Sequence, residues 1–188
     1  MTTELANYLE RLEDLRGQIL GLVASLSAEA LNWRPLPGTE DHATNTLAAL
    51  AAHSAGAEHF WIGEVIGGRP ATRDREAELA TRAVSAEQIF RLLDDTAQET
   101  RDVFRTLKDT DLADTRQAAG RTVIVRWCLL HVIDHTSLHL GHMQITFQLW
   151  AGGESIPSPL WYDRRPHHPE NELRSTHGLA DGPGDESQ

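Results

Sequence analysis

The segment HVIDHTSLHLGH, from His131 to His142, carries four histidines at spacings of four, four and three residues. Because each residue of an α-helix turns by about 100°, the imidazoles at 135, 139 and 142 fall within roughly 80° of His131. The side chains therefore share one stripe. Apolar residues nearly surround the same stretch, and a helix that is apolar on most sides lies inside a bundle rather than on its surface. The segment predicts a central helix whose histidine stripe faces neighbouring helices.

Other stretches of the chain also repeat apolar residues at helical spacing. Ser85 followed by Gln88 is a capping-box pattern at the start of one of them. Near the start of the histidine-rich helix, β-branched residues at 122–125 favour a short strand as the alternative. The polar stretches 69–84 and 109–121 predict connections. The predicted long helices cover about residues 3–27, 44–67, 86–107 and 122–150.

The 188 residues are enough to bury one core, and we expect an all-α domain, a four-helix bundle, over residues 1–155. Residues 156–188 are rich in proline, glycine and polar side chains, which predicts an extension that is partly docked and then disordered. A net charge of −11 argues against nucleic acid as a partner, which needs clustered basic residues. The sequence has no signal-peptide pattern and no apolar run of about 20 residues, so we expect a cytoplasmic protein with no membrane partner. The single cysteine, Cys128, excludes an internal disulfide.

A pair of histidines four residues apart, such as His135 and His139, is a familiar pair of metal ligands, because one helical turn brings both nitrogens to the same ion. A third donor must come from elsewhere, and His53 lies in the second predicted helix among small residues. Three protein ligands leave a coordination position open, as in catalytic zinc sites, where a water or a substrate thiol binds. The alternative is that these histidines are core residues satisfied by hydrogen bonds. The spacing alone leaves both interpretations open.

Three stretches carry a resemblance to a known family: LNWRPLPG at 31–38, HSAGAEHFW at 53–61 and RWCLLHVIDHTSLHLGH at 126–142. Together they resemble the DinB-like superfamily, and most of all its branch related to the N-terminal domain of mycothiol-dependent maleylpyruvate isomerase. The resemblance implies a DinB/YfiT-like four-helix bundle with a divalent metal between the second and fourth helices. The implied ligands are His53, His135 and His139. At the position of His135 the family carries either His or Glu, and Glu is usual in the isomerase branch, so the chain resembles the general pattern more at this point.

Members of this superfamily are metal-dependent transferases, isomerases and hydrolases that often use a low-molecular-weight thiol such as mycothiol or bacillithiol. The resemblance therefore implies a thiol-dependent S-transferase acting on a small electrophile, with zinc as the first choice of metal and nickel or iron as alternatives. His131 and His142 flank the proposed ligand pair and are the candidate acid or base. A homodimer is expected by analogy. The competing hypotheses are a metal-dependent hydrolase, a non-catalytic protein that binds a metal or small ligand, and a dimerisation module whose histidines pack without metal.

Two further charged residues have predicted roles. Glu58 either orients a ligand histidine or forms an interhelical ion pair, and the sequence leaves both open. Arg126 lies on the opposite side of its helix from His135, so a salt bridge is expected there rather than a substrate contact.

Overall fold

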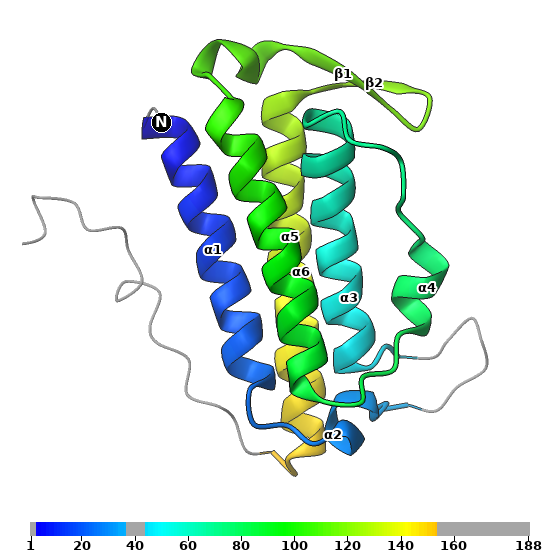
Figure 1. Ribbon diagram of the computed structural model, residues 1–188. Coiled ribbons are helices and arrows are strands. Elements are labelled where there is room, and N and C mark those ends of the chain that lie inside the picture. The colour runs from blue at the N-terminus through cyan, green and yellow to red at the C-terminus, as the bar shows by residue number, and fades with distance from the viewer. Residues whose placement is uncertain (1–2, 37–43, 154–188) are drawn as a thin grey trace, which may run out of the picture. The chain divides into compact units, whose positions relative to one another are not determined.

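The computed structural model describes residues 3–36 and 44–153. This part of the chain is mostly helical, and its long helices lie side by side (Figure 1). α1 packs against α5 and α6, and α3 packs against the same two helices, so each long helix has two long neighbours. The long helices are α1 (Thr3–Val23), α3 (Leu47–Glu58) with its π-helical continuation η1 (His59–Ile66), α5 (Ala86–Thr106) and α6 (Val125–Trp150).

Short elements connect the long helices. The connection predicted over 69–84 contains a helical segment, because Asp74 caps its start by accepting a hydrogen bond from the Ala77 amide at 2.9 Å. The short elements are α2 (Ala28–Asn32), α4 (Arg75–Ala80), the 3₁₀ helix η2 (Asp109–Ala113), and the strands β1 (Thr115–Ala118) and β2 (Arg121–Ile124).

The strands β1 and β2 pair antiparallel, with Thr115 opposite Ile124, so the expectation of an all-α chain was wrong at this point. The turn between them has positive φ at Ala119 (48°) and Gly120 (77°), which is the backbone geometry of a tight hairpin. The β-branched residues before Val125 belong to β2, and α6 therefore begins at Val125 rather than near residue 122.

The ends of other helices also differ from prediction. α1 ends at Val23, four residues before the expected end at 27. α3 begins at Leu47, where the side chain of Thr46 accepts a hydrogen bond from the Ala49 amide at 3.0 Å. α5 begins at Ala86 as predicted, but the expected capping box does not form. Gln88 instead accepts from the Val84 amide at 3.0 Å, one residue before Ser85.

The buried core consists of two apolar clusters, and each long helix gives one half of its length to each. A polar layer separates them. In it Arg16 of α1 and Thr100 of α5 both donate hydrogen bonds at 2.5 Å to Oε1 of Glu58 at the end of α3. Burial is costly for an ion pair unless its charges are closely matched, and here both partners are buried. The clusters are represented by Ile19, Leu50, Leu93 and Met143 in the first, and by Leu5, Ile62, Phe104 and Leu129 in the second.

The C-terminal extension predicted at 156–188 lies outside the described residues. Within the described residues, none of the helices combines the length and the apolar character that crossing a bilayer requires.

Cys128 is buried, and burial raises the pKa of its thiol to about 11, consistent with a core residue rather than a reactive one. Arg126 pairs with Glu4 at 2.8 Å, which confirms the expected salt bridge.

Candidate metal centre

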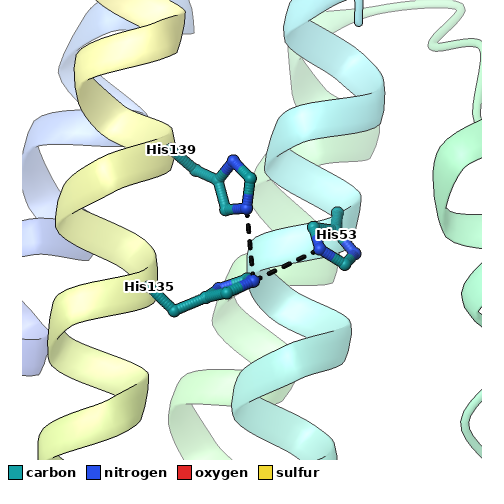
Figure 2. A group of neighbouring side chains, drawn as sticks. All are labelled: His53, His135 and His139. Carbon is teal, nitrogen blue, oxygen red and sulfur yellow. Dashed lines mark hydrogen bonds between the residues drawn. The ribbon is translucent and has the colours of Figure 1, made fainter.

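The structure brings together His53 of α3 with His135 and His139 of α6 (Figure 2). The Nε2 atom of His135 lies 3.2 Å from Nε2 of His53 and 3.2 Å from Nε2 of His139. One ligand atom from each residue lies within 4.8 Å of the others. Within the described part of the chain, no fourth His, Cys, Asp or Glu joins this group. The arrangement is therefore a three-nitrogen cluster from two neighbouring helices.

Local sequence explains how the two helices come close enough. α3 reads LAALAAHSAGAE, so alanines flank His53 and leave room for α6. His53 itself is buried, with 6% of its surface exposed. On α6 the spacing of four places His135 and His139 on successive turns of one face. Small residues on one helix and a one-turn repeat on the other thus make the nitrogens converge.

The carboxylate of Glu78, in α4, orients His53 from behind. Its Oε2 lies 2.8 Å from Nδ1 of His53. Arg73 holds the carboxylate in place, because its Nε donates to Oε1 at 2.8 Å and its Nη2 donates to Oε2 at 3.0 Å. Gly56 leaves space for this contact, since a Cβ at that position would lie 2.0 Å from Oε1 of Glu78. A histidine held by a carboxylate is a recurring arrangement behind protein metal ligands.

The hydrogen-bonding capacity of the cluster fits a cation. A carboxylate accepts, so His53 carries its proton on Nδ1 and turns the lone pair of Nε2 toward α6. If the two contacts at His135 were hydrogen bonds, one N–H would have to serve two acceptors. A divalent cation among the Nε2 atoms would accept the lone pairs of all three imidazoles, so the donor set fits a metal site.

Burial keeps His135 and His139 neutral at neutral pH. Burial, together with the neighbouring histidines, lowers the pKa of His135 to about 3 and that of His139 to about 4. Neutral imidazole is the form that binds metal, because protonation removes the lone pair that coordinates. The two residues therefore present free lone pairs at neutral pH without a cost for deprotonation.

The other two histidines of the stripe lie beside the cluster without joining it. His131 stacks on Trp127, with ring centroids 4.8 Å apart and planes 10° from parallel, and it meets the ring of Trp61 edge-on. Burial lowers its pKa. His142 is exposed, and its ring centroid is 5.6 Å from that of His139. The structure places both candidates beside the ligand pair, one in an aromatic wall and one open to solvent.

The orienting carboxylate was not predicted from the sequence. Glu58, one of whose predicted roles was to orient a ligand, forms instead the buried ion pair with Arg16, which was the alternative interpretation. Glu78 lies in the stretch 69–84, where Asp74 and Glu76 are also acidic and nothing in the sequence sets Glu78 apart from them. A capping aspartate at 74 was the available signal that a helix begins there. Nothing in the sequence shows that this helix packs on α3.

Fold and site together define a mostly helical protein with a candidate three-histidine metal centre between two of its long helices. A family model described as the DinB superfamily matches residues 11–143. The chain belongs to the DinB superfamily.

Solved structures agree with this assignment. A conserved protein from Enterococcus faecalis superimposes with a TM-score of 0.63 at 18% identity, over 81% of this chain and 99% of the other. A DinB-like protein from Bacillus cereus superimposes with a TM-score of 0.64 at 18% identity, over 80% and 95% of the two chains. At such identity the likeness shows the fold. No curated protein sequence matches the chain.

Proposed function

We propose that the protein is a DinB/YfiT-like four-helix bundle that binds a divalent metal through His53, His135 and His139 and acts as a metal-dependent enzyme. One observation carries the proposal: the Nε2 atoms of three imidazoles converge from α3 and α6, and a carboxylate fixes one of them. Zinc is the first choice for an all-nitrogen set, with nickel or iron as alternatives. Three donors without a fourth from the described residues favour an open, catalytic type of site over a closed, structural one.

The proposed reaction is transfer of a low-molecular-weight thiol, of the mycothiol or bacillithiol type, to a small electrophile. A bound divalent ion would supply Lewis acidity and favour the deprotonated form of a thiol beside it. Around it, the protein keeps its own ligands neutral and holds His53 in one tautomer through Glu78. His142 is the exposed imidazole beside the ligand pair, so it is better placed than the stacked His131 to take up a proton from a substrate.

The first experiment is elemental analysis of protein purified without a histidine tag. We expect about one divalent ion per chain, and a His135→Ala variant should lose it. Rates of conjugation to 1-chloro-2,4-dinitrobenzene would then be measured with mycothiol, bacillithiol, glutathione and cysteine. His142→Ala should keep the metal and lower the rate. Full metal occupancy with no reaction for any of these thiols would exclude the transferase assignment.

A hydrolase using the same centre, or a non-catalytic binding protein, is the alternative. The binding protein would have a closed site with four imidazoles. The observation that favours it is the ring of His142, whose centroid lies 5.6 Å from that of His139. The visible spectrum of the cobalt-substituted protein separates the cases. A spectrum that changes on His142→Ala would assign this histidine as a ligand and favour the binding protein, whereas an unchanged spectrum leaves it free for proton transfer.

Two narrower points remain predictions. The first is membership of the branch related to mycothiol-dependent isomerase, which predicts that mycothiol is the preferred thiol in the conjugation assay. A homodimer in the cytoplasm is expected by analogy with the superfamily, and sedimentation equilibrium on the purified full-length chain tests the oligomeric state directly.

A further inference from the structure

A cavity of about 590 Å³ lies at the end of α6, beside the candidate metal centre. Three parts of the chain line it: the residues after α2, the residues around the start of α3, and the last turns of α6. A volume of this size is in the range of pockets that hold drug-sized molecules, roughly 300–1,000 Å³. The cavity is therefore large enough for most of a small substrate.

The described lining is mostly apolar, and its polar members are Thr44, Asn45, His142 and Thr146. Leu36, Ile145 and Leu149 line the cavity, although they are 63%, 57% and 57% exposed. Among the described residues, no Asp, Glu, Lys or Arg lines it. By contrast, a second cavity of about 510 Å³, between α3, α4 and α5, is lined by several charged side chains, including Arg69 and Glu99. In a chain with a net charge of −11, a large cavity whose described lining carries His142 as its one titratable side chain is a selective environment for an uncharged apolar group.

Contacts within the wall of this cavity and behind it hold the wall in place. The ring of Trp33 packs edge-on against Trp150, with centroids 5.8 Å apart. Asn32 bonds the backbone of residue 83 in both directions, donating at 2.7 Å and accepting at 3.0 Å. The Leu36 amide donates to the side chain of Thr44 at 3.1 Å. A wall fixed in this way loses little freedom when a ligand enters, so its apolar surface is available for binding.

The cavity adjoins the candidate metal centre through two residues. His142 lines it and lies one turn after His139 on α6. Leu50 also lines it and lies one turn before His53 on α3. These two residues mark the part of the cavity nearest in the chain to the cluster, although His53, His135 and His139 do not line it themselves. A molecule with its body in the cavity would reach the imidazoles only through an end that extends past His142 and Leu50.

We propose that this cavity binds an uncharged apolar group of about the size of two aromatic rings, and that this group is part of the substrate. The binding site stands on the cavity alone, whereas its role as a substrate subsite rests on the proposed function. Under this proposal the substrate is a small molecule with an aromatic or branched aliphatic body and a reactive end that reaches the metal centre.

Fluorescence titration of the full-length protein with N-phenyl-1-naphthylamine tests this inference. The probe is uncharged and has about the size proposed. Its matched partner, 1-anilinonaphthalene-8-sulfonate, has the same rings and adds one negative charge. We expect saturable binding of the uncharged probe at one site per chain and weaker binding of the sulfonate.

Matched variants locate the site. Ile145→Gln should weaken binding of the uncharged probe about tenfold, because it replaces apolar contact surface by a polar amide. Leu138→Gln is the control: Leu138 lies two turns earlier on the same helix, is 58% exposed, and does not line the cavity. It should leave binding unchanged. Both positions are exposed, so neither substitution should unfold the protein, and thermal unfolding checks this.

No binding to the wild-type protein, equal effects of the two substitutions, or preference for the sulfonate would overturn the inference. The probe needs neither metal nor turnover, so the result is independent of the proposed function. A protein that binds the probe at Ile145 but carries no metal would refute the proposed function alone, and an active metalloenzyme that ignores the probe would refute this inference alone.

Discussion

Substitution of Glu78 by Gln should weaken zinc binding about 10- to 100-fold while leaving the protein folded. The carboxylate touches none of the Nε2 atoms, and its effect reaches them only through the His53 ring. It fixes the proton on Nδ1 and so keeps the lone pair of Nε2 directed at α6. It also supplies a negative charge that makes the imidazole a stronger donor to a cation.

The magnitude follows from the contacts of Glu78. Both Glu78 and His53 are buried, at 9% and 6% exposure, so the 2.8 Å contact between them is shielded from water. Hydrogen bonds to charged groups contribute about 1.5–3 kcal/mol. A glutamine keeps the shape but presents an NH₂ group either to the imidazole or to Arg73, both of which are donors there. Losing one charge-assisted bond of this size corresponds to about one to two powers of ten in a binding constant.

The assay is competition for Zn²⁺ between the protein and a chromophoric chelator of known affinity. Glu76→Gln is the matched control, because Glu76 lies on the same short helix, is exposed, and undergoes the same change of charge. Thermal unfolding of the metal-free variants would show whether either substitution disturbs the fold. If Glu78→Gln binds zinc within about twofold of Glu76→Gln, the carboxylate does not position the ligand and the reasoning is refuted.

Three further predictions follow from the same contacts. Gly56→Ala should displace Glu78 and weaken zinc binding in the competition assay, whereas Gly17→Ala, in open space, should leave zinc binding unchanged. Acid should destabilise the metal-free protein as pH falls from about 6.5 toward 4, because the lowered pKa values of His135 (about 3) and His139 (about 4) mean that the unfolded chain takes up these protons first; in urea unfolding each histidine should contribute a slope of up to about 1 kcal/mol per pH unit, and His135→Asn should remove its share. Glu58→Gln should lower the free energy of unfolding by about 3 kcal/mol, because it removes the short buried ion pair of Arg16 and leaves this guanidinium only the 3.7 Å contact with Glu13; zinc affinity should be kept, the reverse of Glu78→Gln.

The long helices were predictable because their signals are local. Apolar residues recur at helical spacing in each of them, and the repeat of four between His135 and His139 places both on one face whatever surrounds the helix. The approach of His53 was less constrained by sequence. Alanines around it indicate a helix that packs closely, but its convergence with α6 became an expectation only through the family resemblance.

The parts that sequence could not give depend on tertiary contacts. Glu58 and Glu78 are both buried glutamates. Glu58 contacts Arg16 and Glu78 contacts His53, and this difference depends on where Arg16 and α4 lie in the folded chain. The hairpin is an intermediate case. Its β-branched residues at 122–124 favour a strand, but the continuous apolar pattern into α6 competes with that signal. The π-helical turns of η1 after Glu58 have no comparable sequence signal.

The separation of the two glutamates has a consequence for chemistry at the centre. Glu58 is paired with Arg16 on the α1 side of α3, so this ion pair carries no net charge toward the metal centre. Glu78 faces the centre but shares its charge with Arg73. The imidazoles of His135 and His139 are neutral at physiological pH because burial lowers their pKa values. The protein groups around the site therefore sum to about zero charge, and a divalent ion held there would keep nearly its full charge for an exogenous ligand. Such a site would favour an anion, and this supports the proposed thiol substrate, because a thiol ionises far more readily than an alcohol or an amine.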